Sequence, residues 1–245
     1  MEHKTFSDSV SVFLPTRGRY VSFEDSLYSI SKTKEADSLL DLIILADQDT
    51  KSFQIAQDFS EKHKFHSYKV IYSAKRLYPV KAFVSLYEIC SSMFFFWTTN
   101  RVKYKEDWLV DALSFFKEHF PDKVGVLAMG GKRNKANIGM SSQEFVRYNE
   151  GSWFSSFYRM NYCDDELACR AILLGRYFFM KNSLVSFEDT EDLLYPSEDK
   201  KVAFKKVDRS LFYERTSFNF NLPVEKMHSW KGFRNINLPL KGDLG

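Results

Sequence analysis

Apolar and polar stretches alternate along the first half of the chain in an order that predicts strands and helices in turn. Residues 9–14 are a β-branched and aromatic run that ends at Pro15, which is typical of a strand. Residues 42–46 are a continuous apolar run, as in a strand that is covered on both faces. Residues 22–25 resemble a capping box, and apolar residues follow them at helical spacing. Further strands are expected at 68–73, 93–98 and 124–129, and further helices at 51–62, 80–91 and 106–119.

This order of elements is typical of βαβ units, which form a mostly parallel sheet. Ligands bind to such sheets at the carboxyl ends of the strands. The corresponding loops of this chain are expected at 15–19, 47–50, 74–79 and 98–104. The sequence therefore predicts an α/β fold with a ligand site at one edge of the sheet.

The alternation stops near residue 130, where a Gly-rich basic stretch begins. The aromatic residues between Trp153 and Tyr162 fit a core better than a sugar-stacking wall, although both interpretations are open. A helix is expected at 164–174, because acidic residues in its first turn suit the helix dipole. A last strand is expected at 177–181.

The overall charge is small, with 35 Lys and Arg against 32 Asp and Glu, so bulk electrostatics does not indicate nucleic-acid binding. Residues 196–245 are locally basic, with ten Lys or Arg against six Asp or Glu. The three cysteines form no C-x-x-C pair, so the sequence indicates neither a disulfide framework nor a zinc finger. No apolar stretch approaches the length of a membrane span. These features predict a cytoplasmic protein without a membrane span.

Four motifs occur in a familiar order: LPTRGR after the first strand, ADQD after the second, an aromatic strand before Trp108, and DDELACRAILLG at the last helix. In this order they resemble the nucleotide-diphospho-sugar glycosyltransferases of GT-A fold, closest to family 2. The resemblance covers roughly residues 9–190. It implies a Rossmann-like GT-A catalytic domain at 1–190, an irregular basic aromatic extension at 191–245, and a nucleotide-diphosphate sugar as donor, with a UDP-sugar as first choice.

The resemblance also assigns site residues. Asp164 matches the acidic position that acts as the catalytic base in inverting members, and Glu166 matches the second acidic position. Taken alone, these acids could simply cap the helix. The acids after the second strand could likewise be ordinary turn residues. The residues expected to contact the donor are Pro15, Thr16, Arg17, Asp47, Asp49, Asn100 and Arg101.

One departure concerns the metal. The D-x-D motif that holds a divalent cation in the family is replaced by Thr98, Thr99, Asn100 and Arg101. Mg²⁺ and Mn²⁺ prefer charged oxygen ligands, so a metal is doubtful. Either Arg101 or another cation neutralises the leaving diphosphate, or the catalytic site has decayed.

Two functions follow from this sequence. The first is transfer of a sugar to an acceptor hydroxyl, with a modified DNA base or a carbohydrate as acceptor and a protein acceptor also open. The second is a non-catalytic module that binds a nucleotide sugar. The basic aromatic tail would suit a polyanion such as DNA and would equally suit an ordinary surface.

Overall fold

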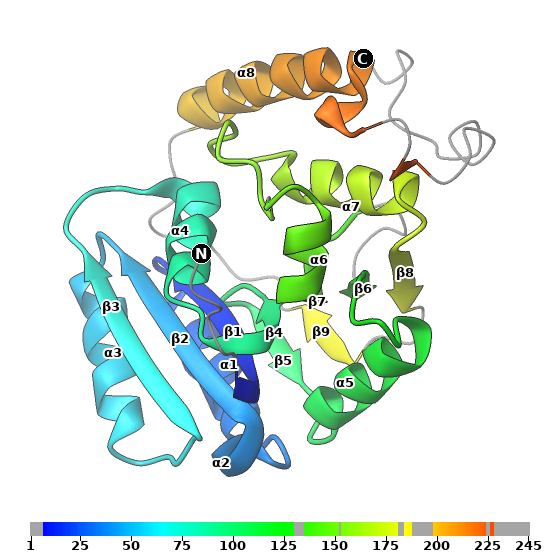
Figure 1. Cartoon of the computed structure of the whole chain (residues 1–245). Helices are drawn as coiled ribbons and strands as arrows, with labels where there is room; N and C mark the ends of the chain where they lie inside the picture. The colour runs from blue at the N-terminus through cyan, green and yellow to red at the C-terminus, as the bar shows by residue number, and fades with distance from the viewer. Residues whose placement is uncertain are drawn as a thin grey trace.

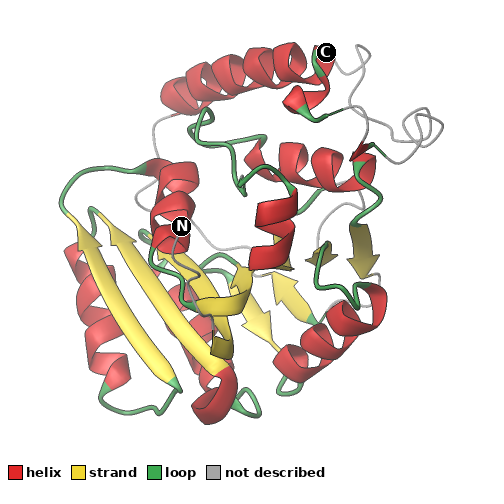
Figure 2. Cartoon of the chain, viewed as in Figure 1, coloured by secondary structure: helices red, strands yellow, loops and turns green. Residues whose placement is uncertain are grey.

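The computed structural model describes residues 7–129, 135–151, 153–180, 184–187, 198–223 and 226–227. Its centre is a seven-stranded sheet between two layers of helices (Figure 1, Figure 2). In spatial order the strands are β3 (Ser67–Ser73), β2 (Leu40–Asp47), β1 (Ser7–Thr16), β4 (Ser92–Trp97), β7 (Ile138–Ser142), β6 (Val126–Met129) and β8 (Tyr177–Met180). Only β7 runs antiparallel to its neighbours in this sheet. The predicted α/β class with a mostly parallel sheet is confirmed.

Side chains of the central strands alternate between two cores, one on each face of the sheet. Phe13 and Phe95 face the core that α4, α6, α7 and α8 cover, whereas Val12 and Phe96 face the core of α1, α3 and α5. All eight residues of β2 are buried, because helices cover both of its faces. The helices are α1 (Tyr20–Ser31), α2 (Ala36–Leu39), α3 (Thr50–Ser60), α4 (Tyr78–Glu88), α5 (Trp108–His119), α6 (Gln143–Tyr148), α7 (Cys163–Leu173), α8 (Glu198–Ser217) and the short 3-10 helix η1 (Asn219–Asn221).

Three strands were not indicated by the sequence. β5 (Val102–Tyr104) and β9 (Val185–Phe187) form a small antiparallel pair, and β7 completes the main sheet. Gly139 of β7 pairs with Trp97, where a Cβ atom would lie 2.4 Å from the Leu127 carbonyl oxygen. Only glycine allows this close approach, and a short strand that contains glycine and serine lacks the usual apolar pattern.

Two local expectations were wrong. The segment after 191 was expected to be irregular, yet α8 extends over 20 residues of it. The first helix begins at Tyr20 and not at the capping box near Ser22; Arg19 precedes it in the left-handed region at φ 54° without a side-chain cap. The proposed boundary near residue 190 and the tail beyond Met227 lie outside the described residues.

The aromatic cluster is mostly core. Trp153 and Phe154 are buried and stacked with ring centroids 4.2 Å apart, whereas Phe157 is 67% exposed. The three cysteines are buried and free. Within the described ranges, no helix combines the length and apolar character needed to cross a membrane.

Candidate active site

The carboxyl ends of β1, β2 and β4 lie next to each other in the sheet, so their loops meet at one edge. Asn100 ties two of these loops together: its side-chain amide donates to the Thr16 hydroxyl at 3.0 Å and to the Gly18 carbonyl at 3.2 Å. Asn100 and Thr16 are both buried. The loop after β1 is therefore held against the loop after β4 by hydrogen bonds that have no access to water.

Asp49 holds the loop after β1 from the other side. Its carboxylate accepts hydrogen bonds from the Gly18 amide at 2.7 Å and the Ser52 hydroxyl at 2.6 Å, and it caps α3 through the Ser52 amide. Burial alone would raise the pKa of Asp49, but the hydrogen bonds from Ser52 and Gly18 outweigh burial and lower the pKa. Asp49 is thus an ionised structural anchor of the edge.

Three half-buried arginines lie on these loops, namely Arg17, Arg19 and Arg101. The hydrogen bonds of Asn100 and Asp49 fix the backbone from which they project. A guanidinium offers planar, paired N–H donors that match phosphate oxygens. The edge thus combines fixed loops with the chemistry that recognises a diphosphate. Pro15 is half-buried and lies in β1, next to its last residue.

Asp47, at the end of β2, is directed toward the loop before α4. One carboxylate oxygen accepts from the Leu77 amide at 2.7 Å, and the other accepts from the Tyr78 amide at 3.2 Å and pairs with Arg76. Asp47 is only 3% exposed. Its contacts in the structure therefore position this loop, and an additional contact with the base or ribose of a nucleotide stays a prediction.

Asp164 lies in the first turn of α7, half-buried and beside Asp165. Burial, together with repulsion from Asp165, raises the pKa of Asp164 from 3.8 to about 6. The opposing attraction comes from Lys135, which pairs with Asp165 at 2.9 Å. A carboxylate with such a pKa is ionised at neutral pH and is a better proton acceptor than an ordinary aspartate.

A short chain of contacts connects the first turn of α7 to the end of β4. Lys135 pairs with Asp165, and the next residue, Ala136, accepts a hydrogen bond from the Trp97 indole at 2.6 Å. Trp97 is the last residue of β4 and directly precedes the loop of Asn100. The N-terminus of α7 is thus held on the same side of the sheet as the loop after β4.

Glu166 differs from Asp164 in its surroundings. It is 1% exposed and accepts two hydrogen bonds from Arg215 of α8, both 2.7 Å long, and one from the Tyr158 hydroxyl at 2.7 Å. Arg170, one turn further along α7, lies 3.6 Å from it. Both oxygens of Glu166 are therefore engaged in joining α7 to α8.

The residues at the expected D-x-D position do not fit a divalent cation. Thr98 directs its hydroxyl to Tyr104, and Asn100 uses its amide nitrogen to hold Thr16 and Gly18. Neither is a charged oxygen ligand. Among the residues that the structure describes, no group of three His, Cys, Asp or Glu side chains could hold a metal ion.

Several residues of the candidate site were not found from the sequence, namely Ser52, Arg76, Lys135 and Arg215. Ser52 had a local signal, because it follows a helix-capping aspartate by three residues. The others contact partners 29 to 49 residues away, which no local pattern reveals.

No protein-family model matches the sequence, and no curated protein has a similar sequence. The structure is nevertheless similar to solved proteins, including these two. One is S. aureus TarS 1–349 in complex with UDP, with TM-score 0.62 and 14% identity over 89% of this chain and 76% of that chain. The other is the mannosyltransferase PcManGT from Pyrobaculum calidifontis in complex with GDP-Man and Mn²⁺, with TM-score 0.66 and 12% identity over 87% of this chain.

TarS 1–349 also matches in complex with UDP-GlcNAc, at TM-score 0.63. This chain covers 65% of the mannosyltransferase and 46% of a longer TarS chain. At such low identity the likeness concerns the fold. The chain has the GT-A fold of nucleotide-sugar glycosyltransferases, as the order of its motifs predicted.

Proposed function

We propose that this protein is a glycosyltransferase that moves a sugar from a nucleotide diphosphate, with UDP as the first choice, onto an acceptor hydroxyl. The observation that carries the proposal is Asp164, a half-buried acid with a pKa of about 6 in the first turn of α7, a turn that contacts through Lys135 and Ala136 connect to the end of β4 in a GT-A sheet. Complexes of similar folds with UDP, UDP-GlcNAc and GDP-Man support a nucleotide-sugar donor.

In the proposed reaction Asp164 accepts the proton of the acceptor hydroxyl as its oxygen attacks the anomeric carbon. The bond between that carbon and the diphosphate oxygen breaks, and the nucleoside diphosphate leaves with the electron pair. Residues 98–101 include no carboxylate that could hold a metal ion. In its place, Arg17 and Arg101 stabilise the negative charge that develops on the leaving diphosphate. Thr16, Asp49 and Asn100 keep the arginine-bearing loops in place.

Glu166 takes a positioning role in this proposal. Its bonds to Arg215 and Tyr158 fix the first turns of α7, from which Asp164 projects. Pro15 and Asp47 border the donor, and Asp47 positions the loop that carries Arg76. We also propose a cytoplasmic location, residues 1–190 as the catalytic unit, and residues 191–245 as an extension that packs on it. The acceptor is a modified DNA base or a carbohydrate.

The second candidate function is a binding module that takes up nucleotide sugars without turnover. The observation that favours it is the structural use of Thr98 and Asn100 at the place of the usual metal ligands. A panel of UDP-sugars and GDP-sugars, each with and without Mn²⁺, separates the two functions. Release of the nucleotide supports transfer or hydrolysis, and saturable binding without release supports the binding module.

A further inference from the structure

The N-terminal half of α8 packs against the first residue of α4 (Figure 1). Phe204 of α8 meets the Tyr78 ring at 5.1 Å between centroids. The guanidinium of Arg159 lies 5.4 Å from the Phe204 ring, and that of Arg76 lies 5.0 Å from the Tyr78 ring. Two helices that are far apart in the sequence thus meet through aromatic rings with arginines over them.

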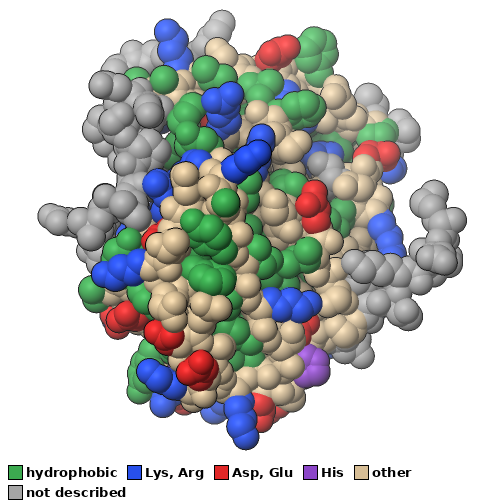
Figure 3. All heavy atoms as spheres, turned by 90° about the vertical axis from the view of Figure 1, so that its left-hand side faces the viewer, with side chains coloured by type: hydrophobic (Ala, Val, Ile, Leu, Met, Phe, Trp, Pro, Cys, Tyr) green, Lys and Arg blue, Asp and Glu red, His purple; other side chains and the backbone are tan. Residues whose placement is uncertain are grey.

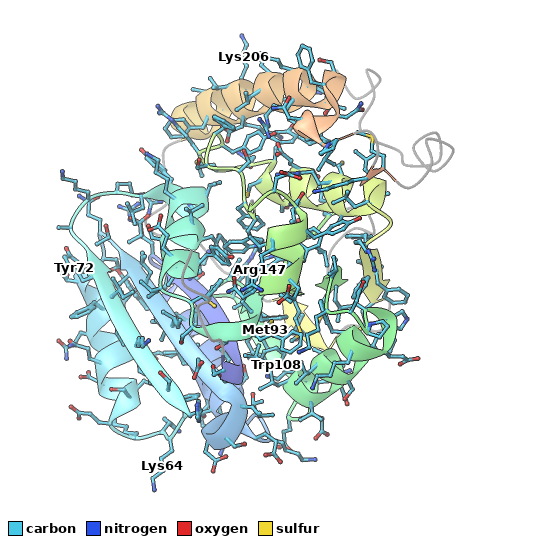
Figure 4. The ribbon with its side chains drawn as sticks, viewed as in Figure 1. Lys64, Tyr72, Met93, Trp108, Arg147 and Lys206 are labelled. Carbon is cyan, nitrogen blue, oxygen red and sulfur yellow. The ribbon has the colours of Figure 1, made fainter. Side chains whose placement is uncertain are left out.

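The surface around this contact is rich in cations. We call this surface, together with the adjoining outer side of α8, the α4–α8 basic surface, and its members are Lys75, Arg76, Lys81, Arg159, Lys205, Lys206 and Arg209. Figure 3 shows Lys and Arg side chains gathered over the upper part of this side of the molecule, where α8 and the loop before α4 lie. Lys206 projects from the side of α8 that faces away from α4 (Figure 4). The whole chain carries a formal charge of only +3.

Among the described residues, two acids, Asp47 and Asp208, contact this surface. Neither of them neutralises its exposed lysines. Asp47 is buried and pairs with Arg76. Asp208 is also buried, and its carboxylate accepts the backbone N–H groups of Arg159, Met160 and Asn161 at 2.9 to 3.1 Å. Both acids therefore serve to attach loops, and the cations outside remain in excess.

Four lysines of the surface, Lys75, Lys81, Lys205 and Lys206, are exposed and form no ion pair with any residue in the described ranges. Within α8, Arg209 follows the two lysines by three and four residues, so like charges are neighbours on one helix face. Such pairs weaken a helix. Helix stability therefore does not explain why these three cations lie together. Binding of an anionic partner would explain it.

We propose that the α4–α8 basic surface binds an acceptor chain that carries several phosphate groups. This inference rests on the proposed function and names its acceptor class. A chain fits better than a single phosphate because the cations are spread over α4, α8 and two loops. The loop of Arg76 is held by Asp47 at the end of β2. A chain bound here therefore lies beside the carboxyl ends of β1, β2 and β4, the edge proposed to bind the donor, which we call the donor edge.

The test is a titration of the intact protein with a fluorescein-labelled single-stranded oligothymidylate of about 15 nucleotides, followed by anisotropy at several salt concentrations. Neutralised phosphates release counterions, so log K should fall with log salt at a slope of roughly −3.5 if about five phosphates are contacted. Inorganic polyphosphate serves as an unlabelled competitor without bases.

A matched pair of charge reversals locates the binding. Lys205→Glu with Lys206→Glu changes the proposed surface, and Lys62→Glu with Lys64→Glu makes the same change at exposed lysines elsewhere. Lys206 and Lys64 lie at opposite ends of the molecule in Figure 4. The first pair should weaken binding about tenfold or more and make the salt slope shallower by roughly 1.4, the share of two phosphate contacts. The second pair should retain both values.

Competition by polyphosphate would support recognition of the acceptor through its chain of phosphate groups. Oligothymidylate binding that polyphosphate does not displace would mean that bases are read, and it would overturn the proposal. Equal losses in both variant pairs, or no saturable binding of either polymer at low salt, would also overturn it. Displacement of the polymer by UDP would assign the surface to the donor instead. UDP binding measured alone tests the proposed function separately.

Discussion

The donor edge and the α7 side of the candidate site use their acidic residues differently. At the donor edge, Asp47 and Asp49 are buried and hold neighbouring loops through hydrogen bonds and one ion pair. On the α7 side, Asp164 is half-buried and forms no ion pair with any described residue. Burial raises the pKa of Asp164, whereas hydrogen bonds lower the pKa of Asp49.

This difference separates structural from chemical carboxylates within one site. An acid that accepts several hydrogen bonds is a poor base, because protonation would cost those bonds. An acid that is desolvated and lies beside another acid accepts a proton more readily. Of the acids that the sequence marked, Asp164 alone has the second set of surroundings among those the structure describes.

The largest effect is expected for Asp164→Asn. Loss of a positioned base should lower the turnover rate by about 10² to 10⁴. Nucleotide affinity should stay within about threefold, because the base contacts the acceptor and not the diphosphate. Steady-state kinetics and UDP calorimetry check both values. Asp165→Asn is the matched control: if it proves the more damaging change, the base has been assigned one residue too early.

Glu166→Gln should act mainly on stability. Removing this charge leaves Arg215 and Arg170 without their buried counterion, which should lower the free energy of unfolding by about 3 to 5 kcal/mol. The control is Glu144→Gln, which breaks a surface pair with Arg147 and should cost less than about 1 kcal/mol. Urea denaturation compares the two. Equal losses would show that α7 and α8 are not joined in this way.

Asp47→Ala should weaken nucleotide binding by about 1 to 3 kcal/mol. The substitution frees the amides of Leu77 and Tyr78 and leaves Arg76 without its partner, so the loop beside the donor edge loses its anchor. Calorimetry with UDP measures the effect, and exposed Asp37→Ala serves as the control. Unchanged affinity in a folded Asp47→Ala protein would remove this residue from the donor site.

The pH dependence should follow Asp164. Because its pKa is raised to about 6, the unprotonated base is present above that pH and is lost as the pH falls through it. The rate should therefore be flat near neutral pH and decrease about tenfold per pH unit in acid. Lys135→Met removes an attraction that favours the ionised form, so it should move the midpoint to higher pH. A flat profile between about pH 5 and 8 would contradict the assignment.

Much of the sheet could be predicted because β1, β2 and β4 are apolar runs that both helix layers cover. β7 could not, since its buried serines and Gly139 carry no apolar pattern. α8 was missed because its first half is highly charged and its buried face includes Asp208.

Within the site, the acids were visible as residue types but their roles were not. The bonds that distinguish Glu166 from Asp164 come from Arg215, 49 residues further along the chain. The raised pKa of Asp164 depends on burial that only packing creates. A motif can therefore mark an acidic position, and the tertiary contacts decide which acid is free to accept a proton.

The most direct test of the account is nucleotide release from the best donor and acceptor, measured in EDTA for the wild type and for Asp164→Asn. The account predicts that the wild type keeps its rate within about twofold of the rate with Mn²⁺, because residues 98–101 supply no charged oxygen ligand. It also predicts that Asp164→Asn loses about 10² or more in rate under the same conditions. Activity that EDTA abolishes and Mn²⁺ restores, or an Asp164→Asn protein with full activity, would contradict it.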